Sequence, residues 1–496
     1  MDSNSLVIIG GDAAGMSAAS KVRRKQPERE IIVFEKSHYT SYSACGIPYY
    51  ISQTVKSSDD LIRRSPEEFR IKYNIDVRTM HRVLEVDTDN KRIKVLDKEN
   101  NREFWQEFGQ LLIATGGKPY CPKDVEGHNA GNVFGISTLK SGIKLENYIR
   151  ENNPKTAVII GGGYIGLEMA EALLVRGLKV SLINRSEQVM NTLDPDMGEA
   201  ISKAVINLGV ILYRKESLKS FICENGNVTA VVTDNRTIET DIVVFGMGSS
   251  PATDFLKNSK IELGVKGAIK VDAHMQTNIP NVWAAGDCTE TLNLVSKQHV
   301  YIALGTVANK TGLVAGSSIA GEKAMFPGAV GTAVCKVCKY EVARTGLNEK
   351  ELKQLKIDYV TATIESKTRA DYYPGAKDIT VKLLAEKIVK LGFAKLKDIL
   401  ADKGMSMDDV DYFLPHLSSY FFENKIEGFF AENGISVPKE KWYSNLVTKG
   451  NVGAASIYIM LDEVFNSGAL KKGEKILLAV PESSRFSYMF CLLTVV

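Results

Sequence analysis

The sequence predicts an α/β protein built around two Rossmann-like dinucleotide-binding domains. A glycine-rich turn that joins an apolar strand to a helix occurs twice, at residues 10–15 and 161–166. This order of elements places a helix N-terminus against a pyrophosphate, which is the fingerprint of dinucleotide binding. The length of 496 residues also exceeds that of a single-core domain, so several domains are expected.

The first glycine-rich turn follows the apolar stretch 6–9. A second apolar strand, 31–34, ends at Glu35, which stands 20 residues after the last glycine of the turn and is placed to bind ribose hydroxyls. Asp12 occupies the position where the fingerprint usually has its second glycine. The residues of this turn that we expect to bind a nucleotide are Gly10, Gly11, Ala14 and Gly15.

The second turn follows the apolar strand 157–160 and has the fuller glycine pattern. The next strand, 180–183, is followed by Asn184 and Arg185 rather than by an acid. A carboxylate there would prefer a free ribose 2′-hydroxyl and repel a 2′-phosphate, so its absence leaves NADPH open beside NADH. The other residues expected to contact this nucleotide are Gly161, Gly163, Tyr164, Ile165, Gly166 and Glu168.

Three further turns fit a chain that leaves one nucleotide domain, builds another and returns. In chain order they contain Ala114, Thr115 and Gly116, then Gly248, then Gly286 and Asp287. The spacing resembles that of the pyridine nucleotide-disulfide oxidoreductases. The resemblance implies FAD and NAD(P)H as cofactors, with the turn 114–116 at the border of the FAD domain and Asp287 on the ribityl chain of the flavin. We also expect Lys36 and Val83 to contact a cofactor.

The resemblance divides most of the chain into domains. Residues 1–118 and 251–325 form the two parts of the FAD-binding domain, and residues 119–250 form the NAD(P)-binding domain. Residues 326–386 form a truncated α+β dimerisation domain, of which only about the first half is expected. A homodimer is therefore the expected assembly.

Cys45 is the predicted catalytic residue. It lies about ten residues after the first ribose-binding strand, where the resembled family has its redox cysteine beside the flavin. Family members with two cysteines have four residues between them, but this chain has Tyr50 at the second position, and its next cysteine is Cys121. A lone thiol holds its oxidised state as a mixed disulfide or a sulfenic acid. We expect the surroundings of Cys45 to lower its pKa, because the thiolate is the nucleophile.

The segment 41–49 looks like that of coenzyme A-disulfide reductases and related NADH oxidases. Ala13 stands where NADH peroxidases of the same branch have a histidine, which disfavours peroxidase activity, and Ala44 replaces an asparagine that often precedes the cysteine. The substrate implied is coenzyme A or a similar small thiol or disulfide. The resemblance places four residues along its channel, with basic groups suited to its phosphates: Ser17, Lys21, Arg24 and Ser41.

Residues 387–496 resemble the C-terminal half of type III β-ketoacyl synthases, which have a thiolase fold. His416 and Asn451 match the histidine and asparagine that activate the malonyl group in that family. The acyl-accepting cysteine belongs to the absent N-terminal half, so we expect an inherited but idle pair. Half of this fold also predicts an uncovered apolar face. Two copies that pair about a two-fold axis, or a gene or assembly junction with a poorly folded tail, are the competing interpretations.

Composition excludes several classes of function. With 24% charged residues, 44% hydrophobic residues and a net charge of +3, the chain has no feature that indicates nucleic acid as a partner. We find no run of about 18 apolar residues and no signal stretch, so a cytoplasmic protein without a membrane partner is expected. Seven cysteines in a long chain indicate reduced thiols. Cys335 and Cys338 have no second Cys or His pair nearby, so both are interpreted as strand cysteines and no metal site is expected.

The leading hypothesis is an FAD-dependent NAD(P)H oxidoreductase that reduces coenzyme A disulfide or a related small disulfide or persulfide through Cys45. One alternative is a water-forming NADH oxidase, which would consume oxygen without added disulfide. Another is a catalytically impaired fusion that acts as a nucleotide-binding or acyl-carrier-interacting scaffold. That alternative predicts bound FAD which NADPH does not bleach.

Overall fold

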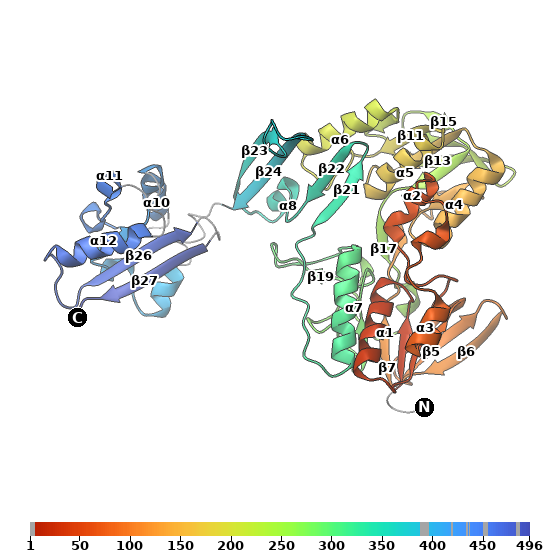
Figure 1. Cartoon of the computed structure of the whole chain (residues 1–496), viewed down its shortest axis with the longest axis horizontal. Helices are drawn as coiled ribbons and strands as arrows, with labels where there is room; N and C mark the ends of the chain where they lie inside the picture. The colour runs from red at the N-terminus through yellow and green to blue at the C-terminus, as the bar shows by residue number, and fades with distance from the viewer. Residues whose placement is uncertain are drawn as a thin grey trace. The chain divides into compact units, whose positions relative to one another are not determined.

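The computed structural model describes residues 5–386, 396–417, 420–432, 435, 437–449, 455–482 and 487–496. The chain forms two compact units, Met1–Asn348 and Glu349–Val496 (Figure 1). The division between them falls inside the segment 326–386 that was expected to be the dimerisation domain. The five domain ranges expected from the sequence stay predictions. Every helix among the described residues is too short or too polar to cross a bilayer.

The first unit contains a five-stranded parallel sheet of short apolar strands that pack with both faces covered. One face is covered by α1 (Ala13–Lys25) and α7 (Gly305–Ile319). These helices pack closely because Gly312 and Gly316 have no side chain; a Cβ at either position would collide with the α1 backbone. In spatial order the strands are β18 (Val282–Ala284), β7 (Gln110–Ile113), β1 (Leu6–Ile9), β2 (Ile31–Phe34) and β3 (Asp76–Arg78).

An antiparallel three-stranded sheet covers the other face of this first sheet. Val83, Val86, Ile93 and Val95 from it share one buried cluster with Val7 and its neighbours. Its strands are β4 (His81–Asp87), β5 (Arg92–Asp97) and β6 (Arg102–Glu107). The short helix α3 (Pro66–Tyr73) packs beside β3, where Ser65 caps its N-terminus through the Glu68 N–H.

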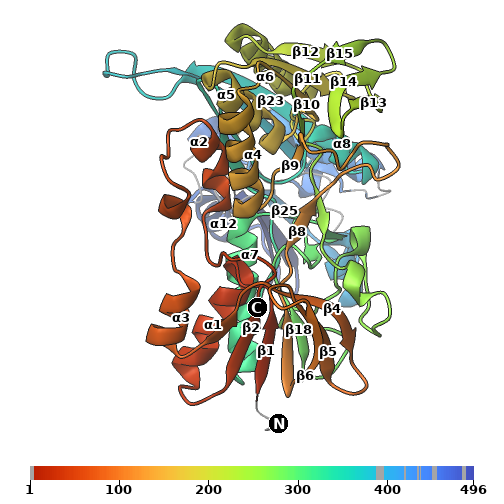
Figure 2. The ribbon, with the colours of Figure 1, turned by 90° about the vertical axis from the view of Figure 1, so that its right-hand side faces the viewer.

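A second parallel sheet repeats the arrangement. Figure 2 shows it with its helices α4 (Leu139–Asn152), α5 (Tyr164–Val175) and α6 (Pro195–Leu208), away from the sheet of β1 and β2. Its strands in spatial order are β12 (Ile211–Arg214), β11 (Lys179–Asn184), β10 (Thr156–Ile160), β16 (Ile242–Phe245) and β9 (Val133–Gly135). Its other face packs on the antiparallel strands β13 (Leu218–Glu224), β14 (Asn227–Thr233) and β15 (Thr237–Glu239).

The chain passes between the two sheets along one antiparallel pair. Strand β8 (Gly117–Pro119) leads out of the first sheet, and β17 (Ser249–Pro251) returns beside it. The second sheet is therefore an insertion between two parts of the first. After the return come the short strands β19 (Thr291–Leu292) and β20 (His299–Val300) and then α7. This path agrees with the excursion and return predicted from the order of the turns.

Two hairpins occupy the segment expected to be a truncated dimerisation domain. In the first unit, β21 (Ala333–Val337) and β22 (Tyr340–Arg344) pack Val337 and Val342 into the core that contains α5. Cys338 lies in the turn between them with a φ of 55°, so the interpretation of both cysteines as strand residues is wrong for Cys338. The tight turn requires a left-handed residue at that point.

The second hairpin belongs to the second unit and pairs β23 (Tyr359–Lys367) with β24 (Asp378–Glu386). Its register gathers Val360, Ile364, Val381 and Leu383 with their neighbours on one exposed face. On the opposite face, Tyr359 and Lys382 contact Glu349 of α8 (Glu349–Gln354). The hairpin thus has one polar side, which contacts α8 through Tyr359 and Lys382, and one apolar side, which is exposed.

The C-terminal segment contains a three-stranded sheet with helices on both faces. It consists of β25 (Tyr412–Pro415), β26 (Lys475–Glu482) and β27 (Ser487–Thr494), with β25 and β26 parallel. Phe413 and Leu477 pack on a helix at 396–402 and on α10 (Tyr420–Glu432), whereas Leu414 and Leu478 pack on α12 (Ala455–Asn466). The remaining helix is α11 (Leu446–Lys449). The predicted uncovered apolar face is therefore not on the sheet, because alternate strand residues pack on helices of the same segment on each side, whereas Tyr458 and Phe465 of α12 stay exposed.

Candidate active site

The first glycine-rich turn has the close packing that a dinucleotide site requires. Gly10 has a φ of 109°, and a Cβ there would collide with the carbonyl oxygen of Ala114, so only glycine fits. A Cβ at Gly15 would collide with the Gly10 carbonyl oxygen. The Gly11 N–H donates to Glu35 Oε2 at 2.9 Å, which fixes this carboxylate at the end of β2. The turn can therefore approach a pyrophosphate closely.

The second turn repeats this geometry with one chemical difference. A Cβ at Gly161 would lie 2.7 Å from the Gly246 carbonyl oxygen, and a Cβ at Gly166 would collide with the Gly161 carbonyl oxygen. The Gly162 N–H donates to Asn184 Oδ1 at 3.2 Å, as the Gly11 N–H does to Glu35. The Asn184 amide at the end of β11 thus accepts the same hydrogen bond as the Glu35 carboxylate at the end of β2, but it carries no charge.

Both turns open into one cleft of the first unit, with a volume of about 2320 Å³. Pockets for a single small ligand usually have volumes of roughly 300–1,000 Å³, so this cleft has room for two dinucleotides. The predicted site residues that line it are Gly10, Gly11, Ala14, Glu35, Lys36, Ser41, Cys45, Ala114, Thr115, Gly116, Gly161, Gly163, Tyr164, Ile165, Glu168, Asn184, Arg185, Gly248 and Asp287.

Asp287 supplies a specific test of whether FAD fits the cleft. Its Oδ1 is buried and has no hydrogen-bond partner among the described residues. Burial raises the pKa of Asp287 to about 6. A buried carboxylate oxygen without a donor is costly, and a hydroxyl of a bound ligand would satisfy it. The residue therefore fits the contact to the ribityl chain that the resemblance implies.

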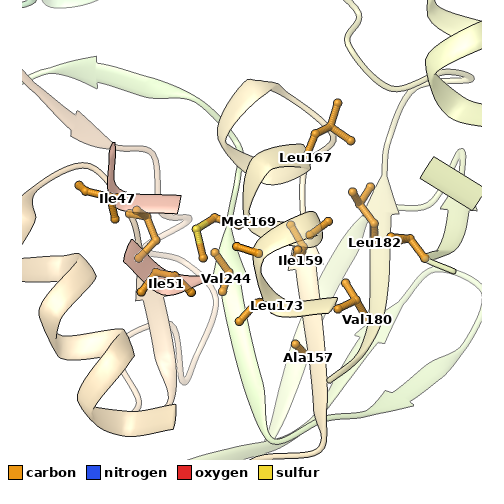
Figure 3. Close-up of a cluster of buried hydrophobic side chains, with 14 of the residues drawn as sticks. Ile47, Ile51, Ala157, Ile159, Leu167, Met169, Leu173, Val180, Leu182 and Val244 are labelled. Atoms are coloured by element: carbon orange, nitrogen blue, oxygen red, sulfur yellow. The ribbon is translucent and has the colours of Figure 1, made fainter. Parts of the chain in front are cut away.

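Cys45 lies in the short 3₁₀ turn Ala44–Gly46, directly before α2 (Ile47–Ile51). Figure 3 shows Ile47 and Ile51 of this helix beside Met169 of α5 and Val244 of β16 in one buried cluster. The helix that follows the cysteine is thus anchored on the second nucleotide fold. The Cys45 side chain itself is exposed to the cleft. This placement puts the thiol in the cleft that both glycine-rich turns line.

The expectation that the surroundings lower the pKa of Cys45 is wrong for the protein's own groups. Partial burial raises the pKa of this thiol, and the Glu168 and Asp287 carboxylates raise it further. The pKa of Glu168 is itself raised to about 7, first by burial and then by Glu171. Among the groups that act on this thiol, the charged side chains are acidic, whereas the backbone hydrogen bond of Cys45 lowers its pKa.

Several predicted contacts lie outside the cleft lining. Val83 packs in the buried cluster under the three-stranded sheet. Ser17, Lys21 and Arg24 lie on α1, where the Ser17 hydroxyl donates to Asn309 Oδ1 at 3.0 Å and Lys21 is ion-paired to Glu322 at 3.0 Å. Of the four predicted substrate contacts, the structure places only Ser41 with Cys45 along the cleft. The assignments of the other three to a substrate channel stay predictions.

Sequence reasoning missed several residues that line the cleft. Asp12 and Tyr42 connect the first turn to the cysteine segment, and Tyr301 and Cys335 also line the cleft. Asp12 was visible as a departure from the glycine pattern, which was a usable signal. Tyr301 and Cys335 come from distant parts of the chain, and no local pattern indicates them.

In the second unit, His416 directly follows β25 and is buried, and its backbone N–H donates to the Ala479 carbonyl oxygen at 2.8 Å. Its predicted partner Asn451 lies outside the described residues. Among the described residues, no group of three or more His, Cys, Asp and Glu side chains is placed to hold a metal ion.

Comparison with known proteins identifies the family. Residues 4–312 match the family model of pyridine nucleotide-disulphide oxidoreductases, and residues 332–390 match the dimerisation domain of the same enzymes. The chain belongs to this family. It is therefore an oxidoreductase that uses FAD and NAD(P)H, and the predicted α/β fold class is confirmed. Residues 400–480 match the C-terminal domain of 3-oxoacyl-[acyl-carrier-protein] synthase III, which confirms the predicted fusion.

Three relatives show the range of activities in this family. The chain is 37% identical over 379 residues to an NADH oxidase of Methanocaldococcus jannaschii, covering 76% of this chain and 84% of the relative. It is 29% identical over 419 residues to a coenzyme A disulfide reductase of Staphylococcus haemolyticus, covering 82% and 92%. A solved NAD-dependent persulfide reductase from A. fulgidus aligns with a TM-score of 0.75 at 34% identity, covering 82% of this chain and 78% of that one.

Proposed function

We propose that this oxidoreductase uses NAD(P)H to reduce coenzyme A disulfide, or a related small disulfide or persulfide, through Cys45. The observation that carries the proposal is the position of Cys45 in one cleft with both glycine-rich turns and with Asp287. The names of the Staphylococcus and A. fulgidus relatives support the same class of acceptor.

For a disulfide, the overall reaction is NAD(P)H + H⁺ + RSSR → NAD(P)⁺ + 2 RSH. FAD supplies a redox-active ring that takes up the two electrons of the hydride and passes them on. The chain would contribute the positions: Glu35 and Asp287 would hold the FAD, and the turn at 161–166 would hold the nicotinamide nucleotide. Cys45 attacks one sulfur of the disulfide, keeps that half as a mixed disulfide and releases the other half as a thiol. The two electrons that come from NAD(P)H, with a proton, then cleave this mixed disulfide, which releases the second thiol and restores the Cys45 thiol.

The test is anaerobic reduction of the FAD-loaded protein with NADPH or NADH, followed by oxidised coenzyme A. Cys45→Ser should retain flavin reduction and lose disulfide turnover by about 10³-fold or more, as expected for loss of a nucleophile. Cys223→Ser is the matched control, because Cys223 is exposed on β13 and does not line the cleft. Retained turnover in Cys45→Ser, or an equal loss in Cys335→Ser, would contradict a single redox thiol.

Reduction of oxygen is the second candidate, because the M. jannaschii relative is named an NADH oxidase. It would use the same cleft and the same cysteine. Stoichiometric oxygen uptake in the absence of disulfide, at a rate above that of disulfide turnover, would favour this function. Bound FAD that neither nicotinamide reduces would instead favour the scaffold hypothesis.

We propose that the second nucleotide site prefers NADPH to NADH. Asn184 places a neutral amide where a carboxylate would repel a 2′-phosphate, and Arg185 beside it lines the cleft with a positive charge. The acidic neighbours are engaged elsewhere, since Glu187 is paired with Lys215 and Glu216 with Arg236. Arginine is well suited to bind a phosphate through several hydrogen bonds.

The dimer is assigned to the apolar face of the hairpin β23–β24. The dimerisation-domain match covers this hairpin, and an isolated two-stranded hairpin is only marginally stable. Val360, Ile364 and Leu383 are each more than half exposed on the face that has no cover among the described residues. We propose that a second copy of the chain covers it, with like faces meeting about a two-fold axis.

A further inference from the structure

Asp12 stands at the position of the first glycine-rich turn where the second glycine is usual. Its side chain does not cap α1, although residue 12 is the N-cap of that helix. Instead, Asp12 Oδ1 accepts a hydrogen bond from the Tyr42 N–H at 3.3 Å. The carboxylate therefore contacts the segment that carries the redox cysteine, three residues before Cys45.

A second hydrogen bond joins the same two segments. The Ser41 N–H donates to the Gly11 carbonyl oxygen at 3.2 Å, and Ser41 has a left-handed φ of 48°. A left-handed conformation is uncommon for serine, and such residues persist where the surroundings hold them. Ser41 is thus hydrogen-bonded to Gly11, and the next residue, Tyr42, is hydrogen-bonded to Asp12.

The other side of this segment is also held. The Ser43 N–H donates to the Leu61 carbonyl oxygen at 2.8 Å, and the Arg63 N–H donates to the Ser41 carbonyl oxygen at 2.8 Å. The segment 41–43 therefore lies between the first turn and residues 61–63, and the 3₁₀ turn with Cys45 starts at the next residue. A shift of the first turn would be transmitted to Cys45 through two short links.

The surroundings of Asp12 are unfavourable for a charged carboxylate, which suggests a structural or functional role for this side chain. Burial raises the pKa of Asp12 to about 7, and the Glu35 and Asp287 carboxylates add to the effect. A pyrophosphate at this turn would add further repulsion. The second turn has Gly163 at the matching position, where a Cβ would meet nothing nearer than 3.5 Å, and no redox segment follows it. Of the two glycine-rich turns, only the first, which contacts the cysteine segment, has a side chain at this position.

We propose that Asp12 is a positioning residue that couples the FAD pyrophosphate turn to the Cys45 segment. Its acceptor oxygen holds the Tyr42 N–H and so fixes where the thiol stands relative to the bound flavin and disulfide. The inference rests on the role of Cys45 proposed above. It assigns to Asp12 no contact with substrate and no proton transfer.

The test compares Asp12→Asn, which keeps an acceptor oxygen at the same place, with Asp12→Gly, which restores the usual fingerprint. All rates are measured on the full-length, FAD-loaded protein and expressed per bound flavin. Asp12→Gly should keep flavin reduction by NADPH within about twofold and lower kcat for oxidised coenzyme A by about tenfold or more, because misplacement of a reacting group slows the chemical step. Asp12→Asn should stay within about threefold of the parent in both steps.

A second readout does not depend on the acceptor. The rate of Cys45 alkylation by iodoacetamide, followed by mass spectrometry of its peptide, should change several-fold in Asp12→Gly and little in Asp12→Asn. Equal losses of flavin reduction and turnover, loss of FAD from Asp12→Gly, or equal damage in both variants would overturn the positioning role. If the parent protein does not turn over disulfides, the proposed function fails, whereas the alkylation comparison still decides the role of Asp12.

Discussion

At the scale of single residues, Cys45 is partly buried and has acidic side chains near it. The thiol has Glu168 and Asp287 as electrostatic neighbours, and both raise its pKa. The pKa of Cys335, a second cysteine that lines the cleft, is raised to about 11, first by burial and then by Glu168. A thiol with a raised pKa is mostly protonated near neutral pH and reacts slowly until a disulfide or cofactor binds. Such a resting state would limit side reactions of an exposed cysteine.

The pKa of Glu168, about 7, gives this arrangement a pH dependence. Above pH 7 the carboxylate is charged and disfavours the Cys45 thiolate, whereas below pH 7 it is neutral and the effect fades. Glu168→Gln should therefore accelerate alkylation of Cys45 by roughly two- to threefold at pH 8 and change it little at pH 6. Alkylation rates between pH 5.5 and 9 without nicotinamide nucleotide check this. Equal acceleration at both ends of the range would contradict the charge argument.

The proposed preference for NADPH also depends on single residues. Removal of a charged hydrogen-bond donor from a phosphate costs about 1.5–3 kcal/mol, so Arg185→Ala should lower the ratio of kcat/KM for NADPH to that for NADH by about tenfold or more. The ratio is obtained from initial rates with each nucleotide. Lys179→Ala is the matched control, since Lys179 begins the same strand β11 at its far end from Arg185. An unchanged ratio in Arg185→Ala would refute the preference.

At the scale of elements, the two nucleotide folds use the same hydrogen bond for different purposes. In each, the N–H of the residue after the first glycine donates to the side chain at the end of the second strand, and that side chain is an acid in one fold and an amide in the other. The strand–turn–helix geometry needs only an acceptor there. The charge of that acceptor is therefore free to differ with the nucleotide that each fold binds.

The hairpin β23–β24 provides a test at the same scale. Leu383 lies on its apolar face, and burial of a leucine is worth about 2 kcal/mol, so Leu383→Asp should raise the dimer dissociation constant by about 30-fold or more. Size-exclusion chromatography with light scattering, at several protein concentrations, measures this. Thr363→Asp introduces the same charge on the opposite face of the hairpin and should leave the dimer intact. Dissociation of both variants alike would point away from this face.

At the scale of the whole molecule, the cleft and the synthase-like segment are separate in the chain. Every residue that lines the cleft belongs to the first compact unit, and the synthase match begins at residue 400. A chain that ends at residue 390 should therefore keep its FAD and be reduced by NADPH within about twofold of the full-length rate. Stopped-flow absorbance of the flavin measures the rate. Loss of FAD from the shortened chain would show that the segment supports the reductase fold.

The synthase-like segment buries its own sheet. Helices on both faces of its sheet enclose two small cores, so this segment does not need the absent half of the thiolase fold to bury its strands. Tyr458 and Phe465 remain exposed on α12. A covered sheet with a few exposed aromatic side chains is compatible with a folded appendage, whereas an open apolar sheet would promote aggregation.

The sequence by itself determined the local chemistry of this protein. The sequence pointed to the two glycine-rich turns, Glu35, Asn184, Asp287 and Cys45 as candidate site residues, because each depends on a short pattern at a strand end or helix start. Their roles at the site stay predictions. The fold class and the fusion were predictable for the same reason, and the comparisons confirm both. The absence of a second cysteine at Tyr50 was also sufficient to favour a single redox thiol.

Tertiary structure alone decided what surrounds those residues. The pKa of Cys45 is raised first by burial and then by Glu168 and Asp287, which lie 123 and 242 positions away in the sequence. No local pattern could give the direction of this shift. The contact between Asp12 and Tyr42 likewise joins two segments 30 residues apart. The cover on both faces of the C-terminal sheet depends on how its helices pack. Long-range packing sets electrostatics and burial, whereas local patterns set backbone geometry and chemical type.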